Sequence, residues 1–206
     1  MKKIIASQLR KPAGFFGKVI GRMLSKNNQF AYQSLDAHLS MSSGMRALEI
    51  GYGPGTGLRY FLTKYAIRID GIDFSELMYR NASKTNARHI REGRANLRFG
   101  DFLDEPFEDE LYDRVYFANV TYFWKDLHQP FAKISRLLKK NGKLVFYMTD
   151  KSFLENNGVT KTDFFHKHDC ADVMGILVDH GFTDINRHAI SDTNTAFLVV
   201  EATKAP

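Results

Sequence analysis

The feature that most constrains this chain is a run of glycines on alternate positions, 51, 53, 55 and 57, directly after a short apolar segment at 46–50. Glycine has no side chain to cover the backbone, so this turn leaves main-chain N–H and C=O groups open to whatever lies above it. A helix-like stretch follows at 58–64. Strand, bare turn and helix in this order are typical of an α/β sheet that binds a nucleotide-like ligand at the carboxyl edge of its first strand.

Strand-like and helix-like segments alternate after residue 44, which predicts a parallel sheet with right-handed crossovers. Only residues 190–194 separate the last two strands. That gap is too short for a crossover helix, so the last strand is expected to pair antiparallel. The predicted strands cover 46–50, 67–73, 97–100, 112–118, 143–149, 183–189 and 195–203, and the predicted helices cover 58–64, 75–92, 127–139 and 170–180, the third of them stopped by Asn141-Gly142.

The length of 206 residues suits a single domain, with an N-terminal helical cap or lid over 1–43 and a core over 44–206. No apolar run approaches the ~18 residues needed to cross a bilayer. A single cysteine, Cys170, allows no internal disulfide and fits a reducing compartment. We therefore expect a cytoplasmic protein, and the sequence carries no signal of its oligomeric state.

The net charge of +6 sits largely in the first 26 residues, which hold seven lysines and arginines and no acid. The apolar residues at 15, 16, 19, 20, 23 and 24 follow helix periodicity, with basic residues opposite. Three interpretations stay open: a lid over the active site, which is our first choice, a helix on a membrane surface, or a helix packed on the sheet. The basic excess also permits an anionic partner such as nucleic acid, or is simply a solvated basic face.

Residues 46–203 resemble the class I S-adenosylmethionine-dependent methyltransferases. The resemblance rests on Glu49-Ile-Gly-Tyr-Gly-Pro-Gly55, on Gly71-Ile-Asp-Phe-Ser75, on Gly100-Asp-Phe102 and on the turn at 137–144 before the fifth predicted strand, in this order and spacing. It implies a three-layer, Rossmann-like α/β sandwich whose seven-stranded sheet is mostly parallel with an antiparallel last strand. It also implies S-adenosylmethionine as the cofactor.

The resemblance assigns roles within a cofactor site. Asp73 follows Gly51 by 22 residues, close to the spacing of an acid that accepts hydrogen bonds from a ribose diol. Asp101 is placed to accept from the adenine amino group. Structural alternatives are that Asp73 is a helix N-terminal acid, that Asp101 caps a turn and that Glu49 only braces the loop. The predicted cofactor residues are Glu49, Gly51, Tyr52, Gly53, Gly55, Asp73, Phe74, Asp101, Phe102 and Asn119.

A dinucleotide-dependent dehydrogenase is the nearest rival, because it also binds adenosine above an acid-terminated second strand. Its G-x-G-x-x-G fingerprint fails in both registers, where the sixth position is Thr56 or Leu58. Pro54 also lies within the loop that a pyrophosphate would need open.

The acceptor side has weaker signals. The tract after the fourth predicted strand lacks the Asn/Asp-Pro-Pro-aromatic turn typical of enzymes that methylate base amines, and it resembles the small-molecule branch of the family. Its aromatic residues either wall an acceptor pocket or belong to the core. The predicted substrate residues are Tyr122, Phe123, Trp124 and Phe165, and the candidates for a catalytic group are His166, His168 and Tyr122.

The predicted function is methyl transfer from S-adenosylmethionine to a small organic acceptor. The alternatives are an RNA or protein methyltransferase, which the basic N-terminus permits, and a cofactor-binding module without catalysis. No metal site is predicted, because the short run from His166 to Asp169 is too small a ligand set.

Overall fold

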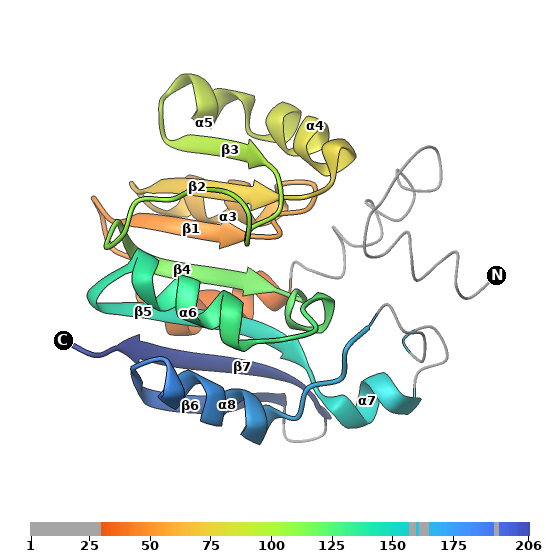
Figure 1. The fold of residues 1–206 in the computed structure, drawn as a ribbon. Coiled ribbons are helices and arrows are strands. Elements are labelled where there is room, and N and C mark those ends of the chain that lie inside the picture. Colours follow the sequence, from red (N-terminus) through yellow and green to blue (C-terminus); the bar gives the residue numbers. More distant parts are fainter. Residues whose placement is uncertain (1–29, 157–159, 161–164, 192–193) are drawn as a thin grey trace.

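The strands form one seven-stranded sheet in the order β3-β2-β1-β4-β5-β7-β6 (Figure 1). The computed structural model describes residues 30–156, 160, 165–191 and 194–206. The strands are β1 (Arg46–Ile50), β2 (Arg68–Asp73), β3 (Ala95–Phe99), β4 (Tyr112–Ala118), β5 (Leu138–Thr149), β6 (Phe182–Ser191) and β7 (Asn194–Lys204). Helical segments are residues 30–39, α3 (Thr56–Lys64), α4 (Glu76–Thr85), α5 (Ala87–Arg91), the 3-10 turn η1 (Thr121–Phe123), α6 (His128–Leu137), α7 (Lys151–Asn156) and α8 (Cys170–Asp179).

One strand of the sheet runs against the others. The pairs β3-β2, β2-β1, β1-β4 and β4-β5 are parallel, whereas β7 is antiparallel to both β5 and β6. The predicted fold class is therefore confirmed. The reason is the one given by the sequence spacing: β6 and β7 follow each other too closely for a crossover helix, so the chain must turn back on itself.

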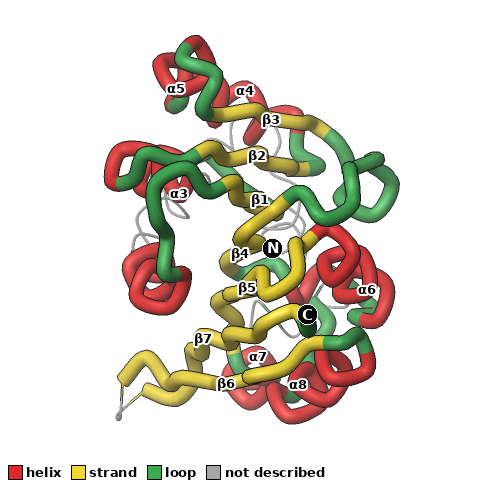
Figure 2. Tube along the Cα trace, turned by 90° about the vertical axis from the view of Figure 1, so that its left-hand side faces the viewer, coloured by secondary structure: helices red, strands yellow, loops and turns green. Residues whose placement is uncertain are grey.

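Helices cover both faces of the sheet (Figure 2). On one face, α6 and α8 pack on a core that includes Phe131, Phe146 and Leu177. On the other face, α3 and the 30–39 helix pack on a second core that includes Leu35, Phe61 and Tyr116. The sheet is thus the middle layer of three, as predicted.

The predicted helix over 75–92 is wrong in one respect, because the chain forms two helices that meet at Asn86. The Asn86 side chain is fully buried, and its Nδ2 atom donates to the carbonyl oxygens of Ala82 and Gly55, each at 3.0 Å. The bond to Gly55 reaches back 31 residues to the glycine turn. The break in the helix therefore anchors the predicted ligand-binding loop.

The predicted end of the helix before the fifth strand is also wrong. The helix α6 ends at Leu137 rather than 139, because Leu138 is fully buried and pairs with Tyr112 on β4. The predicted stop, Asn141-Gly142, lies inside β5, where Asn141 takes a left-handed φ of 60° and the register with β4 shifts. The strand thus begins five residues before its predicted start at 143.

The proposed lid falls mainly on residues 1–29, which lie outside the described residues, so its role stays a prediction, as does the division of the chain at 43. Residues 30–39 pack on the sheet through Ala31, Tyr32, Leu35 and Leu39, all buried. Among the described residues, no helix combines the length and apolar character required to span a membrane.

Replacing Asn86 tests its role as the anchor of the glycine turn. Asn86→Ala removes two buried hydrogen bonds and leaves the Gly55 carbonyl without that donor. We expect the free energy of unfolding to fall by about 2–3 kcal/mol, measured by urea denaturation. Asn96→Ala, an exposed asparagine on β3, is the control and should change stability by less than about 0.5 kcal/mol. Equal effects of the two substitutions would contradict the anchoring role.

Candidate cofactor and acceptor site

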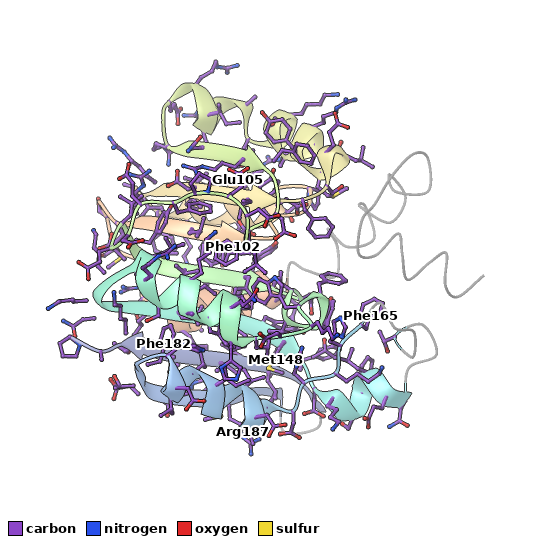
Figure 3. The ribbon with its side chains drawn as sticks, in the orientation of Figure 1. Phe102, Glu105, Met148, Phe165, Phe182 and Arg187 are labelled. Atoms are coloured by element: carbon purple, nitrogen blue, oxygen red, sulfur yellow. The ribbon has the colours of Figure 1, made fainter. Side chains whose placement is uncertain are left out.

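A cavity of about 250 Å³ lies at the carboxyl edge of the parallel strands. Its wall comes from segments far apart in the sequence, and Figure 3 shows two of its residues, Phe102 on the loop after β3 and Phe165 on the segment before α8. The lining residues are Ile50, Gly51, Gly53, Pro54, Ile72, Asp73, Phe74, Met78, Gly100, Asp101, Phe102, Ala118, Asn119, Val120, Tyr122, Phe123, Trp124, Thr149, Phe153, Leu154, Thr160 and Phe165.

Gly53 is the point at which the glycine turn opens to the cavity. Its φ is 54°, in the left-handed region that favours glycine, and a Cβ atom built there would meet nothing within 4 Å. By contrast, a Cβ at Gly51 would lie 2.7 Å from a side-chain carbon of Val120. The bare backbone at 53 is therefore available to a ligand, whereas the glycine at 51 lets the chain pack closely on Val120.

Asp73 joins three pieces of the site at the end of β2. Its Oδ2 atom accepts from the backbone N–H of Gly53 and its Oδ1 atom from that of Ser75, both at 2.8 Å. Burial raises the pKa of this carboxyl to about 6, against the lowering effect of these two hydrogen bonds. At neutral pH the group is thus mostly ionised, and each oxygen keeps a lone pair with which to accept from a ligand hydroxyl.

The loop after β3 carries Asp101 and Phe102, and Lys133 holds it from α6. The Lys133 ammonium donates to the carbonyl oxygens of Phe102, Leu103 and Glu105 at 2.5, 3.0 and 2.6 Å. Asp101 also accepts from the Leu103 N–H at 2.9 Å, so the turn-capping alternative describes a contact that it makes. Its carboxylate is exposed and lines the cavity as well.

Three predicted cofactor residues do not line the cavity. Tyr52 is fully buried, and its hydroxyl donates to the carbonyl oxygen of Arg98. A Cβ at Gly55 would lie 2.5 Å from Asn86 Nδ2, so this glycine faces the helix junction. Glu49 points behind the turn. The remaining seven all line the cavity: Gly51, Gly53, Asp73, Phe74, Asp101, Phe102 and Asn119.

Glu49 is buried beneath the glycine turn. Its Oε2 atom accepts from the Tyr116 hydroxyl at 3.0 Å, and Tyr32 also interacts with this carboxyl group. A Cβ at Gly57 would meet both Glu49 and Tyr32 within 2.5 Å, so glycine at 57 allows the turn to lie on them. Burial raises the pKa of Glu49 to about 8, and the hydrogen bond from Tyr116 offsets only part of that effect. This position favours the bracing alternative for Glu49.

The other end of the cavity is aromatic. Tyr122 and Phe123 on η1 pack edge to face at 4.6 Å between ring centroids, and the ring of Phe165 lies 5.1 Å from that of Tyr122 and 5.6 Å from that of Phe123. Trp124 packs edge-on against Phe117 at 5.3 Å. All four predicted substrate residues line the cavity, although Trp124 also packs on the core.

The two candidate histidines do not line the cavity. The backbone N–H of His166 donates to the Tyr122 carbonyl at 2.8 Å. His168 Nε2 lies 2.8 Å from the carbonyl oxygen of Trp124, and since a carbonyl can only accept, the ring donates there. Both residues thus tie the segment before α8 to the η1 turn, and their roles as bases stay predictions.

Several lining residues have no role predicted from the sequence. Met78, buried on the first turns of α4, carried a weak signal, since it lies three residues after the helix cap Ser75. Val120, Thr149, Leu154 and Thr160 carried none, because nothing local in the sequence indicates which side chains border a cavity between separate segments.

Residues 48–146 match the family model described as a methyltransferase domain. A curated relative, the uncharacterized methyltransferase YdaC of Bacillus subtilis, is 28% identical over 169 residues, which is 82% of this chain and 88% of YdaC.

Solved structures share the fold. Phosphoethanolamine N-methyltransferase 2 of Haemonchus contortus, solved with S-adenosyl-L-methionine, has a TM-score of 0.74 at 19% identity over 85% of this chain and 52% of its own. A chain from the complex between the Haloferax volcanii Trm112 methyltransferase activator and a methyltransferase has a TM-score of 0.79 at 17% identity, over 92% of this chain and 96% of its own.

Fold, glycine turn and relatives together define the class: the chain is a class I S-adenosylmethionine-dependent methyltransferase. S-adenosylmethionine is its cofactor and supplies an electrophilic methyl group when bound. The cavity suits that molecule, since it offers the open backbone at Gly53, an ionised carboxylate at Asp73 and apolar side chains at Phe74 and Met78.

The Asp73 carboxylate should set the affinity for the adenosyl group. In Asp73→Asn, loss of charge-assisted hydrogen bonds should weaken binding of S-adenosylhomocysteine about tenfold or more, measured by calorimetry. Wild-type affinity should also fall as the pH drops below about 6, where Asp73 takes up a proton, and the variant should lack that dependence. Asp104→Asn, an exposed residue outside the cavity, should change neither. Unaltered affinity in Asp73→Asn would contradict the assignment.

Glu49 should make the fold less stable at alkaline pH. Its folded-state pKa of about 8 lies above the ordinary glutamate value of 4.5, so between these pH values the folded state holds more protons than the unfolded state. The free energy of unfolding should therefore fall, by up to about 1.4 kcal/mol per pH unit, as the pH rises through this window. Glu49→Gln should remove that slope and be the more stable protein at pH 8 and above. Denaturation across pH 5–9 measures both, and parallel profiles for the two proteins would refute the prediction.

Proposed function

We propose that this methyltransferase transfers its methyl group to a small, largely apolar or aromatic organic acceptor. The observation that carries the proposal is that one cavity joins the glycine turn, Asp73 and Asp101 to the aromatic cluster of Tyr122, Phe123 and Phe165. An acceptor among these rings would share a chamber with the bound donor. Aromatic walls favour flat or apolar ligands.

The acceptor end offers little acid–base chemistry. Among the described residues that line the cavity, the ionisable side chains are Asp73, Asp101 and Tyr122, and only Tyr122 lies in the aromatic cluster. Burial raises the pKa of its phenol far above neutral pH, so Tyr122 stays protonated and acts as a hydrogen-bond partner rather than as a base. This supports an acceptor atom that is already nucleophilic at neutral pH, with positioning as the main contribution of the protein.

A structural neighbour supports a small acceptor, although it does not identify the acceptor of this chain. The Haemonchus enzyme is named for phosphoethanolamine, a small molecule. The basic N-terminal segment keeps the RNA and protein alternatives worth testing beside the proposal.

Methyl transfer from labelled S-adenosylmethionine tests the proposal directly. The full chain is incubated with a panel of small amines, phenols, thiols and carboxylic acids, apolar and polar members of each, and in parallel with RNA and with a protein extract. We expect labelled product only among small apolar or aromatic acceptors. Label in RNA or protein alone would support the macromolecular alternative, and cofactor binding without transfer to any acceptor would support a non-catalytic module.

Removing one aromatic ring from the cavity wall should weaken binding of the acceptor and leave binding of the cofactor unchanged. In Phe165→Ala we expect the acceptor KM to rise about tenfold, because an aromatic contact of about 1–1.5 kcal/mol is lost, while the Kd for S-adenosylhomocysteine changes less than twofold. Phe99→Ala is the matched control, since Phe99 is 50% exposed on β3 and does not line the cavity. A cofactor Kd that rises with the acceptor KM in Phe165→Ala would show general damage to the site.

A further inference from the structure

A cluster of two histidines and one carboxylate lies outside the cavity. It comprises His38 from the 30–39 helix, His188 from β6 and Glu201 from β7, with one ligand atom of each within 4.8 Å of the others. His188 Nε2 lies 3.0 Å and His38 Nδ1 lies 3.9 Å from the same oxygen, Glu201 Oε1. The two imidazole rings stack at 4.1 Å between centroids. Three elements therefore bring nitrogen and oxygen donors to one point.

The position of this triad follows from strand pairing. Glu201 pairs with Val145 on β5 and with Asn186 on β6, and His188 pairs with Val199, two residues before Glu201. Val145 precedes Thr149, which lines the cavity, by four residues on β5. At about 3.3 Å per residue the triad is roughly 13 Å from the cavity wall, so it is a separate site.

The two oxygens of Glu201 have different neighbours. Oε1 faces both histidines, whereas Oε2 lies 3.4 Å from the Lys143 ammonium. A metal ion held by one carboxylate oxygen commonly has the other oxygen held by a hydrogen-bond donor, which orients the ligand. Lys143 is placed for that role, because it contacts the oxygen that does not face the imidazoles.

The exposure of the three side chains suits an ion in exchange with solvent. The side chains of His38, His188 and Glu201 are 24%, 39% and 17% exposed. Zinc takes imidazole nitrogen and carboxylate oxygen at about 2.0–2.2 Å, and three protein ligands leave its fourth position to water. The farthest-separated ligand atoms, up to 4.8 Å apart, must approach each other by about an ångström to reach that geometry. Partly exposed side chains can make this movement by rotating.

We propose that His38, His188 and Glu201 bind a divalent transition-metal ion, with Zn²⁺ the best match to two imidazoles and one carboxylate. The ion would clamp the 30–39 helix to the β6–β7 edge of the sheet. The same helix carries Tyr32, which lies against Gly57 and Glu49 behind the glycine turn. The clamp is structural and is independent of the acceptor that the enzyme uses.

Zinc titration of the full chain after chelator treatment tests the site, with a chromophoric chelator as competitor at pH 7.5. We expect one equivalent bound with a Kd of about 1 µM or tighter, and a zinc-dependent rise in Tm. Glu201→Gln and His188→Gln should each weaken binding at least tenfold and abolish the rise in Tm, while circular dichroism without metal confirms that the variants fold. Wild-type protein that takes up no zinc at 100 µM would overturn the proposal.

Two further variants separate this site from its alternatives. His128→Ala removes a second close histidine pair, in which His128 Nδ1 and His180 Nε2 lie 3.1 Å apart, and it should leave zinc binding intact. Lys143→Met should weaken zinc binding less than Glu201→Gln does and keep a zinc-dependent rise in Tm, because the lysine orients the carboxylate but does not ligate the ion. Zinc uptake that is lost in His128→Ala and retained in Glu201→Gln would place the ion elsewhere and refute the assignment.

Discussion

The Asp73 carboxylate is the interaction on which the site depends. It lies at the end of β2 and accepts hydrogen bonds from the N–H groups of Gly53 and Ser75. Gly53 belongs to the glycine turn after β1, and Ser75 is the N-cap of α4. One buried carboxylate thus fixes two neighbouring loops at the same edge of the sheet. Because these donors are main-chain groups, the loops keep their places whichever side chains surround them, and a ligand that contacts Asp73 contacts both loops.

The glycine turn is held by protein contacts on the side away from the cavity as well as by Asp73. Glycine at 57 lets the chain settle on Tyr32 and Glu49, and glycine at 55 lets it meet Asn86. Only Gly53 among the four faces both open space and the cavity. The alternating pattern therefore has two physical causes, ligand access at one position and close packing of protein against protein at the others. The buried Glu49, whose carboxyl is largely protonated at neutral pH, takes part in this packing of protein against protein. Its burial there is the reason that the fold should lose stability at high pH.

The sequence predicted what local chemistry determines. The mostly parallel sheet and the reversed β7 follow from the alternation of strands and helices and from the short last loop, and the positions of Asp73 and Asp101 follow from their places at strand ends. The predictions that were wrong concern elements whose limits depend on contacts between residues distant in sequence. The helix break at Asn86 needs the carbonyl of Gly55, 31 residues away, and β5 starts early because Leu138 finds Tyr112 on β4. Neither partner can be inferred from the residues beside it.

The two ends of the cavity differ in the same way. The donor end is built from turns that directly follow β1, β2 and β3, so strand prediction locates it. The acceptor end combines η1, the end of β5, α7 and the segment around Phe165, which the backbone of His166 ties to Tyr122. The parallel sheet fixes the positions of the turns at the donor end, while the segments at the acceptor end can change in sequence without disturbing a strand. This division explains how one scaffold can keep a single methyl donor and still accept different acceptors. Under the proposed function, the aromatic wall rather than the glycine turn selects the acceptor in this chain.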